Sequence, residues 1–368
     1  MKSKLIQLNF SDFGTAAKKA IRLTRWWTFL VPFLLGLLYV NFYLEEISAG
    51  ESLLLTVLFF ITFCGTIAFG YFLNDVTDIG IDREAGITNL AAANGSRKNY
   101  LILFILIVAA LLPWLFLPRN QYNVSLYIFQ LLLLFTYSVF PIRLKRYPIA
   151  CVITDALYNS AVPLLIIFST FIVPEVFCCN TKVCIVFITT ILWAFLKGIR
   201  GILLHQIGDR NNDRKTSINT FVLYYGPLKS FKLIWNFTFR IEIILFSAIV
   251  IYLSLSHFPF LFLILPVFYI YLFLYLRLWE NFYRRRREIR LSFVFIINDL
   301  YEEWLPIVFL IYLGVRNSLF FILLVLHLVL FHNIVKKLYR NGSLVLRNIN
   351  DLFWRAGIVI RNSNSKKT

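Results

Sequence analysis

The sequence predicts an all-α polytopic membrane protein, built as a bundle of nine to ten transmembrane helices around a cytoplasm-facing pocket. Of its 368 residues, 59% are hydrophobic and 15% are charged, whereas soluble domains carry about 25% charged residues. The mean hydropathy is +0.74, and 38 phenylalanines stand against only 15 glycines. This composition argues against an all-β or a disordered chain.

Apolar runs long enough to cross a bilayer recur along the whole chain. They cover residues 26–44, 53–73, 100–118, 122–141, 149–173, 183–204, 235–256, 258–278, 291–314 and 318–336. We expect ten helices if every run spans the bilayer. The split at Gly314–Asn317 is the weakest boundary, and the alternative is that the tenth run is an appendage or a hairpin.

Basic residues gather in alternate connections between these runs. The first group is Lys18, Lys19, Arg22 and Arg25, and further groups lie at residues 83–98, 143–146, 210–215, 284–290 and 336–340. Positive charge favours the cytoplasmic side, so both termini are expected there. The net charge of +18 thus follows membrane topology, and we expect a lipid bilayer and no nucleic acid as partner.

We expect one transmembrane domain, residues 26–336, between an N-terminal segment (1–25) and a cytoplasmic tail (337–368). The expected location is the inner or plasma membrane of a bacterium. The end of the tail, beyond Gly342, is expected to be an interfacial helix or disordered.

A polar segment directly follows the second apolar run and reads Asn74-Asp75-Val76-Thr77-Asp78-Ile79-Gly80-Ile81-Asp82-Arg83. If the helix continues past Leu73, the side chains of Asn74, Asp75, Asp78 and Asp82 share one face. Crowded carboxylates repel one another unless a cation lies between them, and hard oxygen ligands suit Mg²⁺. The alternative is a solvated acidic turn outside the membrane.

A second polar segment leaves the sixth run with the same spacing. His205, Asp209 and Asp213 lie at i, i+4 and i+8, and Lys197 and Gly201 extend that face upstream. The charge pattern puts both segments on the same side of the membrane. Two such faces, each beside arginines, are typical of two halves of one metal–diphosphate site.

These segments resemble the signature of the UbiA-type intramembrane prenyltransferase family, an NDxxDxxxD motif and a DxxxD motif. The basic stretch from Tyr137 to Arg146 is similar to the family's stretch between its fourth and fifth helices, and the match extends from Leu23 to about Gly226. The resemblance implies Mg²⁺-dependent transfer of an isoprenyl group from a polyprenyl diphosphate to an acceptor that the sequence does not identify. The family's lysine and arginine–proline pair after Arg83 are missing. The acceptor and the mode of diphosphate binding therefore do not follow from the resemblance.

The resemblance also implies roles for individual residues. Asp75, Asp78 and Asp82 would hold one metal ion, with Asn74 as a neutral ligand or orienting group, and Asp209 and Asp213 would hold a second. The expected diphosphate-binding cations are Arg83, Arg143 and Lys145. A long isoprenoid tail would enter sideways between helices.

Two further residues are candidate catalytic groups. His205 is expected to be a general base or a hydrogen-bond donor to phosphate, and the alternative is a histidine packed at a helix end. Lys197 lies about 18 Å along the same helix face from Asp209, near mid-bilayer. A cation at that depth usually faces a polar cavity, although its stem can also carry the charge to the interface.

Acidic residues also occur inside two apolar runs. Asp155, with Tyr158 nearby, lies in the fifth run, and Asp299, Glu302 and Glu303 lie in the ninth. The ninth-run acids must line the pocket, pair with a cation such as Lys197, or mark a run that does not span. We expect Asp155, Tyr158 and Glu302 to contact substrate, which favours a polar acceptor.

Two other functions remain open from the sequence. One is transfer of a phosphosugar from a soluble sugar diphosphate to a polyprenyl phosphate at the same aspartates. The other is an ion-coupled transporter, whose path would use Lys197, Asp155 and Glu302. The aspartates cluster at the membrane interface instead of mid-bilayer, which favours phosphate chemistry.

Overall fold

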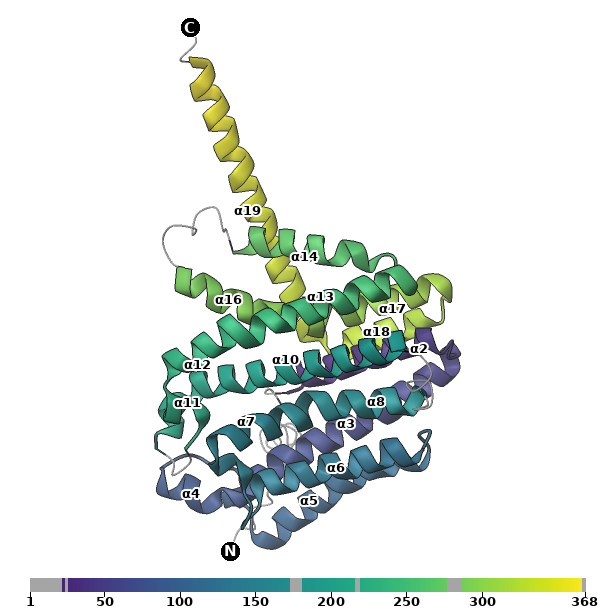
Figure 1. The fold of residues 1–368 in the computed structure, drawn as a ribbon, viewed down its shortest axis with the longest axis vertical. Helices are drawn as coiled ribbons and strands as arrows, with labels where there is room; N and C mark the ends of the chain where they lie inside the picture. Colours follow the sequence, from purple (N-terminus) through teal and green to yellow (C-terminus); the bar gives the residue numbers. More distant parts are fainter. Residues whose placement is uncertain (1–21, 24–25, 173–180, 216–218, 277–285, 366–368) are drawn as a thin grey trace, which may run out of the picture. The chain divides into compact units, whose positions relative to one another are not determined.

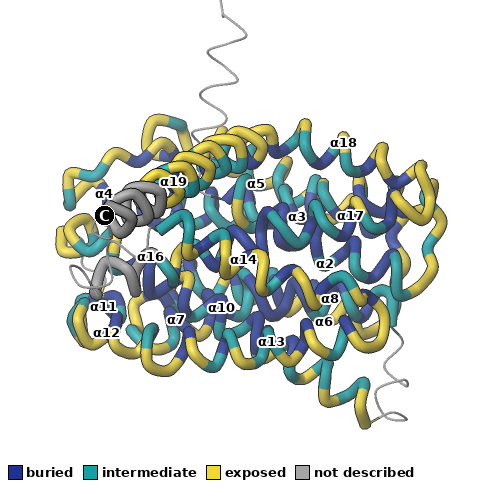
Figure 2. Tube along the Cα trace, turned by 90° about the horizontal axis from the view of Figure 1, so that it is seen from above, coloured by how far each residue is buried: buried dark blue, intermediate teal, exposed yellow. Residues whose placement is uncertain are grey.

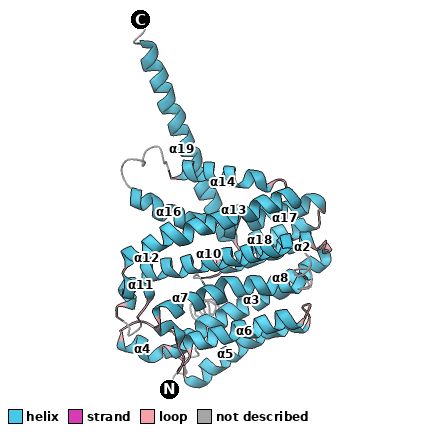
Figure 3. Cartoon of the chain, viewed as in Figure 1, coloured by secondary structure: helices cyan, strands magenta, loops and turns pink. Residues whose placement is uncertain are grey.

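A computed structural model describes residues 22–23, 26–172, 181–215, 219–276 and 286–365 (Figure 1). Every regular element in these ranges is a helix, and none is a strand (Figure 3), as the composition predicted. The chain forms two compact units, Met1–Ile249 and Val250–Thr368. The boundary between them falls within one helix, α13 (Phe239–Ser256).

The first unit holds the elements that carry both polar segments. Its helices are α2 (Leu30–Leu44), α3 (Ala49–Thr77), α4 (Ile79–Glu84), η2 (Ala91–Ala93), α5 (Ser96–Leu111), η3 (Leu112–Leu115), α6 (Gln121–Ser138), η4 (Leu144–Arg146), α7 (Pro148–Ala156), η5 (Leu157–Ala161), α8 (Val162–Phe171), α10 (Thr181–Asp213), α11 (Phe221–Tyr225), α12 (Pro227–Leu233), η6 (Ile234–Thr238) and the first part of α13. Helix α3 packs against α2, α5 and α6, while α8 packs against α2 and α6. Figure 2 shows the resulting buried turns along α2 and α3.

Helix α10 lies close against α7 because its contact position is a glycine. A Cβ atom added at Gly198 would lie 2.7 Å from the Cα of Ala156, closer than real Cβ contacts allow. Farther along α10, the guanidinium of Arg200 donates to Glu242 on α13 at 2.6 Å and 2.8 Å, with both side chains fully buried. These two contacts hold α10, which carries the second polar segment, between its neighbours.

Five helical stretches are long and apolar enough to cross a membrane within the part of the chain that the structure describes. They are Ala49–Thr77, Ser96–Leu115, Pro148–Phe171, Thr181–Asp213 and Pro227–Ser256, and a bent pair at residues 320–354 would make six. Their length and composition are those of an integral membrane protein. The expected count of nine to ten spans is not confirmed, because α2 and α14 (Leu261–Tyr275) have only 15 residues each.

The second unit contains the predicted break between the ninth and tenth runs. Its helices are α14, α16 (Arg286–Asp299), η7 (Leu300–Trp304), α17 (Leu305–Arg316), α18 (Phe320–Leu330) and α19 (His332–Ser365). The expected single helix over 318–336 is wrong, because the chain bends by 82° between α18 and α19. Helix α19 then continues through Gly342, so the tail is helical as far as residue 365.

Two acids of the ninth run, Asp299 and Glu303, pair with a cation, which is one of the outcomes expected from the sequence. That cation is Lys337 of α19. Its Nζ contacts Asp299 at 2.7 Å and Glu303 at 2.6 Å. Glu302 is buried in the same unit.

Candidate active site

Both polar segments line one cavity of about 770 Å³ in the first unit. The first segment contributes Asn74, Asp78 and Asp82, and the second contributes His205, Asp209 and Asp213. The lining also includes Arg22, Thr66, Ile67, Gln130, Leu134, Tyr137, Lys145, Asp155, Tyr158, Asn159 and Ile202. Two segments that lie about 130 residues apart in the sequence therefore face the same space.

The first segment is not one continuous helix, although its four polar side chains were expected to share one helix face. Helix α3 ends at Thr77, Asp78 is its C-cap, and the separate short helix α4 begins at Ile79. Asn74, Asp78 and Asp82 still reach the cavity, but Asp75 is not among the described residues that line it. Asp75 instead forms an ion pair with Arg22, whose Nε donates to Oδ2 at 3.1 Å.

Asp78 is held by two buried cations. The Nζ of Lys145 donates to Oδ1 and Oδ2 of Asp78 at 2.6 Å and 2.7 Å, and to the Asn74 side chain at 2.6 Å. Arg143 also donates to Oδ1 of Asp78. Burial lowers the pKa of Lys145, and the Asp78 carboxylate opposes this shift by favouring the charged ammonium.

Arg143 and Lys145 have different positions, although the same role was expected of both. Lys145 lines the cavity, whereas Arg143 is fully buried behind Asp78 and is not among the described lining residues. The backbone of Arg143 is left-handed, with φ of 41°, an uncommon conformation for a residue with a Cβ. Its guanidinium lies 4.5 Å from the centre of the Phe140 ring and also donates to Asp78. Arg143 therefore orients the Asp78 carboxylate without lining the cavity itself.

Asp82 is supported by a residue that motif spacing does not identify. The Asn89 side chain donates to Oδ2 of Asp82 and to the backbone oxygen of Asp75, both at 2.8 Å. Burial raises the pKa of Asp82, the Asn89 hydrogen bond opposes that shift, and the charge of Asp78 adds to it. One asparagine therefore ties the loop after α4 to two aspartates of the first segment.

The cations at the cavity differ from the expected set. Arg83 is exposed and is not among the described residues that line the cavity. Arg22, which the sequence marked only as a topology signal, does line it. The signal that could have identified Arg22 and Asn89 is slight, since both lie outside the motifs that carry the aspartates.

The second segment is continuous, as the spacing predicted. Helix α10 runs unbroken to Asp213, so His205, Asp209 and Asp213 share one face and all line the cavity. His205 Nε2 lies 3.4 Å from Oδ2 of Asp209, and their side chains are 53% and 34% exposed. This half of the site is therefore much more solvated than the half around Asp78.

Lys197 is buried farther along α10 and is not among the described lining residues of the cavity. Its Nζ lies 4.0 Å from the centre of the Phe33 ring on α2, in a cation–π contact. Glu302 lies in the second unit.

Asp155 and Tyr158 form a polar group on the cavity wall. Tyr158 donates its hydroxyl to Oδ2 of Asp155 at 2.6 Å, and Asn159 donates to Oδ1 at 3.0 Å. The π-helical turn η5 places Tyr158 and Asn159 beside Asp155. The Tyr158 ring packs edge-on against Tyr137 of α6, with the ring centres 5.3 Å apart. All four of these residues line the cavity.

The donor set suits Mg²⁺ shared with a bound phosphate. Within the described ranges, no three His, Cys, Asp or Glu side chains are grouped closely enough to hold an ion by themselves. Mg²⁺ usually binds through one or two carboxylates plus substrate phosphates, and it prefers oxygen ligands. Asp78 with Asp82, and Asp209 with Asp213, each supply two carboxylates at the cavity, so the residues fit that mode of binding.

Comparison with solved structures identifies the fold. The chain is similar to a UbiA homologue from Archaeoglobus fulgidus, with a TM-score of 0.54 and 19% identity over 86% of this chain and 99% of that one. Structures of a UbiA homologue from the same organism bound to DMAPP and Mg²⁺, and to GPP and Mg²⁺, give TM-scores of 0.53 at 17% and 18% identity. Each covers 87% of this chain and 99% of the other. No family model and no curated protein matches the sequence. The chain therefore has the UbiA-type fold that the motifs predicted.

Proposed function

We propose that the protein transfers an isoprenyl group from a prenyl diphosphate to an acceptor within the membrane, in a Mg²⁺-dependent reaction. The observation that carries this proposal is the convergence of two aspartate pairs, Lys145 and Arg22 on one cavity. Solved structures with the same fold were obtained with prenyl diphosphates and Mg²⁺. A cavity of this size lies within the range of small-molecule sites.

Metal and cations would divide the work of binding the diphosphate. Asp78 with Asp82, and Asp209 with Asp213, would hold Mg²⁺, which stabilises the negative charge that builds on the leaving diphosphate. Lys145 and Arg22 would neutralise the remaining phosphate charge. Asn74 orients the Lys145 ammonium through a hydrogen bond of 2.6 Å.

The acceptor would bind beside Asp155. This residue lines the cavity with both carboxylate oxygens fixed by Tyr158 and Asn159, so it can accept a hydrogen bond from a polar acceptor in a defined position. His205 also lines the cavity, next to Asp209, and would contact phosphate or transfer a proton. The site would open to the cytoplasm, with both termini on that side, in the inner or plasma membrane of a bacterium.

Release of diphosphate from a labelled donor tests the proposal without knowledge of the acceptor. Purified full-length protein in detergent would be incubated with labelled geranylgeranyl diphosphate and lipid extracts, with Mg²⁺ or with EDTA. We expect metal-dependent release that is lost in both Asp78→Asn and Asp209→Asn. Consumption of phosphoribosyl diphosphate with polyprenyl phosphate, and of no prenyl diphosphate, would instead establish phosphosugar transfer. The absence of both reactions would contradict an enzyme and leave the transporter.

A further inference from the structure

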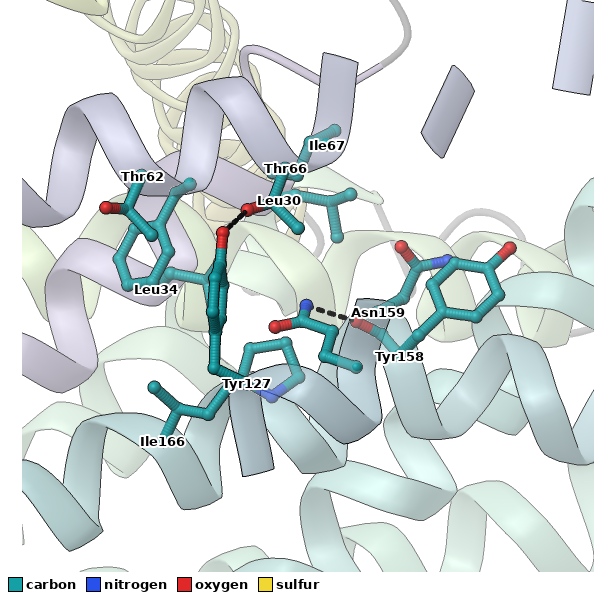
Figure 4. A pocket seen from close by; sticks show the side chains of 12 residues that line it. Leu30, Leu34, Thr62, Thr66, Ile67, Tyr127, Tyr158, Asn159 and Ile166 are labelled. Atoms are coloured by element: carbon teal, nitrogen blue, oxygen red, sulfur yellow. Dashed lines mark hydrogen bonds between the residues drawn. The ribbon is translucent and has the colours of Figure 1, made fainter. Parts of the chain in front are cut away.

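The large cavity ends beside a smaller recess inside the first unit. Five residues line both spaces, namely Thr66, Ile67, Gln130, Tyr158 and Asn159. The recess has a volume of about 20 Å³ and is otherwise lined mostly by apolar side chains, among them Leu30, Leu34, Phe63 and Ile166 (Figure 4). The five shared residues therefore lie between the two spaces, and we call them the end wall.

Hydrogen bonds hold this end wall in place from three elements. Tyr127 of α6 donates to the backbone oxygen of Ala110 at 3.1 Å, so its own oxygen accepts from the Thr66 hydroxyl of α3 at 2.7 Å. Gln130 donates its side-chain amide to the backbone oxygen of Tyr158, in the π-helical turn, at 3.0 Å. Figure 4 shows both cross-connections. Side chains fixed in this way make a barrier that does not yield easily to a ligand.

The wall extends from Tyr158 and Asn159, which contact Asp155, to Thr66 and Gln130. Thr66 and Asp78 are twelve residues apart, which corresponds to about 18 Å at the rise of an α-helix. The lining of the large cavity also includes the apolar side chains of Leu134 and Ile202. A ligand with its diphosphate at Asp78 would therefore extend an apolar tail toward Thr66 and Gln130.

We propose that the end wall limits the length of the donor's isoprenoid tail. The side chain of Gln130 would block the tail, and the side chain of Leu34 would occupy part of the recess beyond Gln130. The preferred donor is then a short-chain allylic diphosphate whose last isoprene unit ends at Gln130. This inference rests on the proposed prenyl transfer and names the donor class for that site. It differs from the sequence-based expectation of a long tail that lies sideways between helices.

Binding of unreactive donor analogues tests the inference independently of the acceptor. Thiolodiphosphates with dimethylallyl, geranyl, farnesyl, geranylgeranyl and longer tails would be titrated with Mg²⁺ into the full-length protein in detergent. We expect affinity to rise with each isoprene unit until the tail reaches the wall and then to fall. In Gln130→Ala, Leu34→Ala and the double variant, we expect this limit to move to a longer tail. That tail should bind about tenfold more tightly than it binds the wild type, because added apolar carbons become buried.

Leu38→Ala is the matched control. Leu38 lies one turn from Leu34 on α2 and is fully buried, yet it is not among the described residues that line either space. Leu38→Ala should lower the unfolding free energy about as much as Leu34→Ala does, and it should leave the limit on tail length unchanged. A thermal melt of each variant shows which are folded, and the wild-type series decides alone if the variants fail to fold.

Three results would overturn the inference. The first is wild-type affinity that stays level or rises through the longest tail, as expected for a tail that leaves between helices. The second is an unchanged limit in the folded double variant, and the third is an equal shift in Leu38→Ala. If none of the analogues binds, the proposed function fails as well, which separates that outcome from the other three.

Discussion

The two aspartate segments have related sequences but opposite environments, so equivalent substitutions should differ in their structural cost. Asp78 is 7% exposed and accepts hydrogen bonds from Lys145 and Arg143, which are 4% and 0% exposed. The Asp209 side chain is 34% exposed and lies 3.4 Å from a half-exposed imidazole. We therefore compare Asp78→Asn with Asp209→Asn.

The magnitudes follow from burial. Removing one partner of a buried ion pair leaves an uncompensated charge and costs about 3–5 kcal/mol of unfolding free energy. Asp78→Asn leaves two buried cations beside a neutral amide, so we expect a loss in that range. An exposed pair contributes about 0–1 kcal/mol. Asp209→Asn should therefore change the unfolding free energy by less than about 1 kcal/mol.

Both variants should nevertheless lose Mg²⁺-dependent diphosphate release by at least about a hundredfold, because each removes a proposed metal ligand. The assay pairs a melt of the detergent-solubilised protein, followed by tryptophan fluorescence, with diphosphate release from a labelled donor. Equal destabilisation by the two substitutions would refute the argument from burial. Near-normal activity in a folded Asp209→Asn protein would refute its role at the metal.

Three further predictions test other parts of the site and its frame. Lys145→Met should weaken binding of a prenyl thiolodiphosphate about a hundredfold. Arg83→Met, at an exposed position outside the described cavity lining, should change this affinity less than about twofold. Similar losses in the two variants would support the expected role of Arg83 in diphosphate binding. Glu242→Gln should lower the unfolding free energy by about 3–5 kcal/mol in the same melt. The double variant Arg200→Met/Glu242→Leu should recover most of this loss, since neither charge of the buried pair then remains. A double variant that is no more stable than Glu242→Gln would contradict this. Since burial raises the pKa of Asp82 and Mg²⁺ needs the deprotonated carboxylate, Mg²⁺ affinity measured by titration calorimetry should fall from neutral to mildly acidic pH, and Asp82→Asn should flatten that dependence.

The sequence predicted much of the site because its evidence was local. Helix α10 keeps His205, Asp209 and Asp213 on one face because the helix continues to the last of them. The apolar runs also located most of the helices, since burial in lipid and burial in protein select the same side chains. Spacing could not show that α18 stops at Leu330, because apolar residues resume at Ile334 after only His332 and Asn333.

The residues that sequence analysis missed depend on tertiary contacts. Arg22 reaches Asp75 across 53 positions, and Asn89 reaches back to Asp82 from the loop after α4. Neither contact has a periodic signal, because both are made by connecting segments whose path is set by packing. For Lys197, the helix face could be predicted, but the contact of its ammonium with the Phe33 ring of α2 could not, because that contact joins two elements far apart in the sequence.

The difference between the two segments begins with a single helix end. Because α3 stops at Thr77, Asp78 is a cap residue with φ of −97° and ψ of 0°, and its carboxylate turns toward the basic stretch instead of along the helix. The equivalent position in the second segment, Asp209, stays inside α10 and keeps its carboxylate near solvent. The first carboxylate is then oriented in advance by protein cations, whereas the second is more exposed. On the proposed function, a donor phosphate that binds the Lys145 ammonium would compete with Asp78 for it, which would couple donor binding to the availability of that carboxylate for metal.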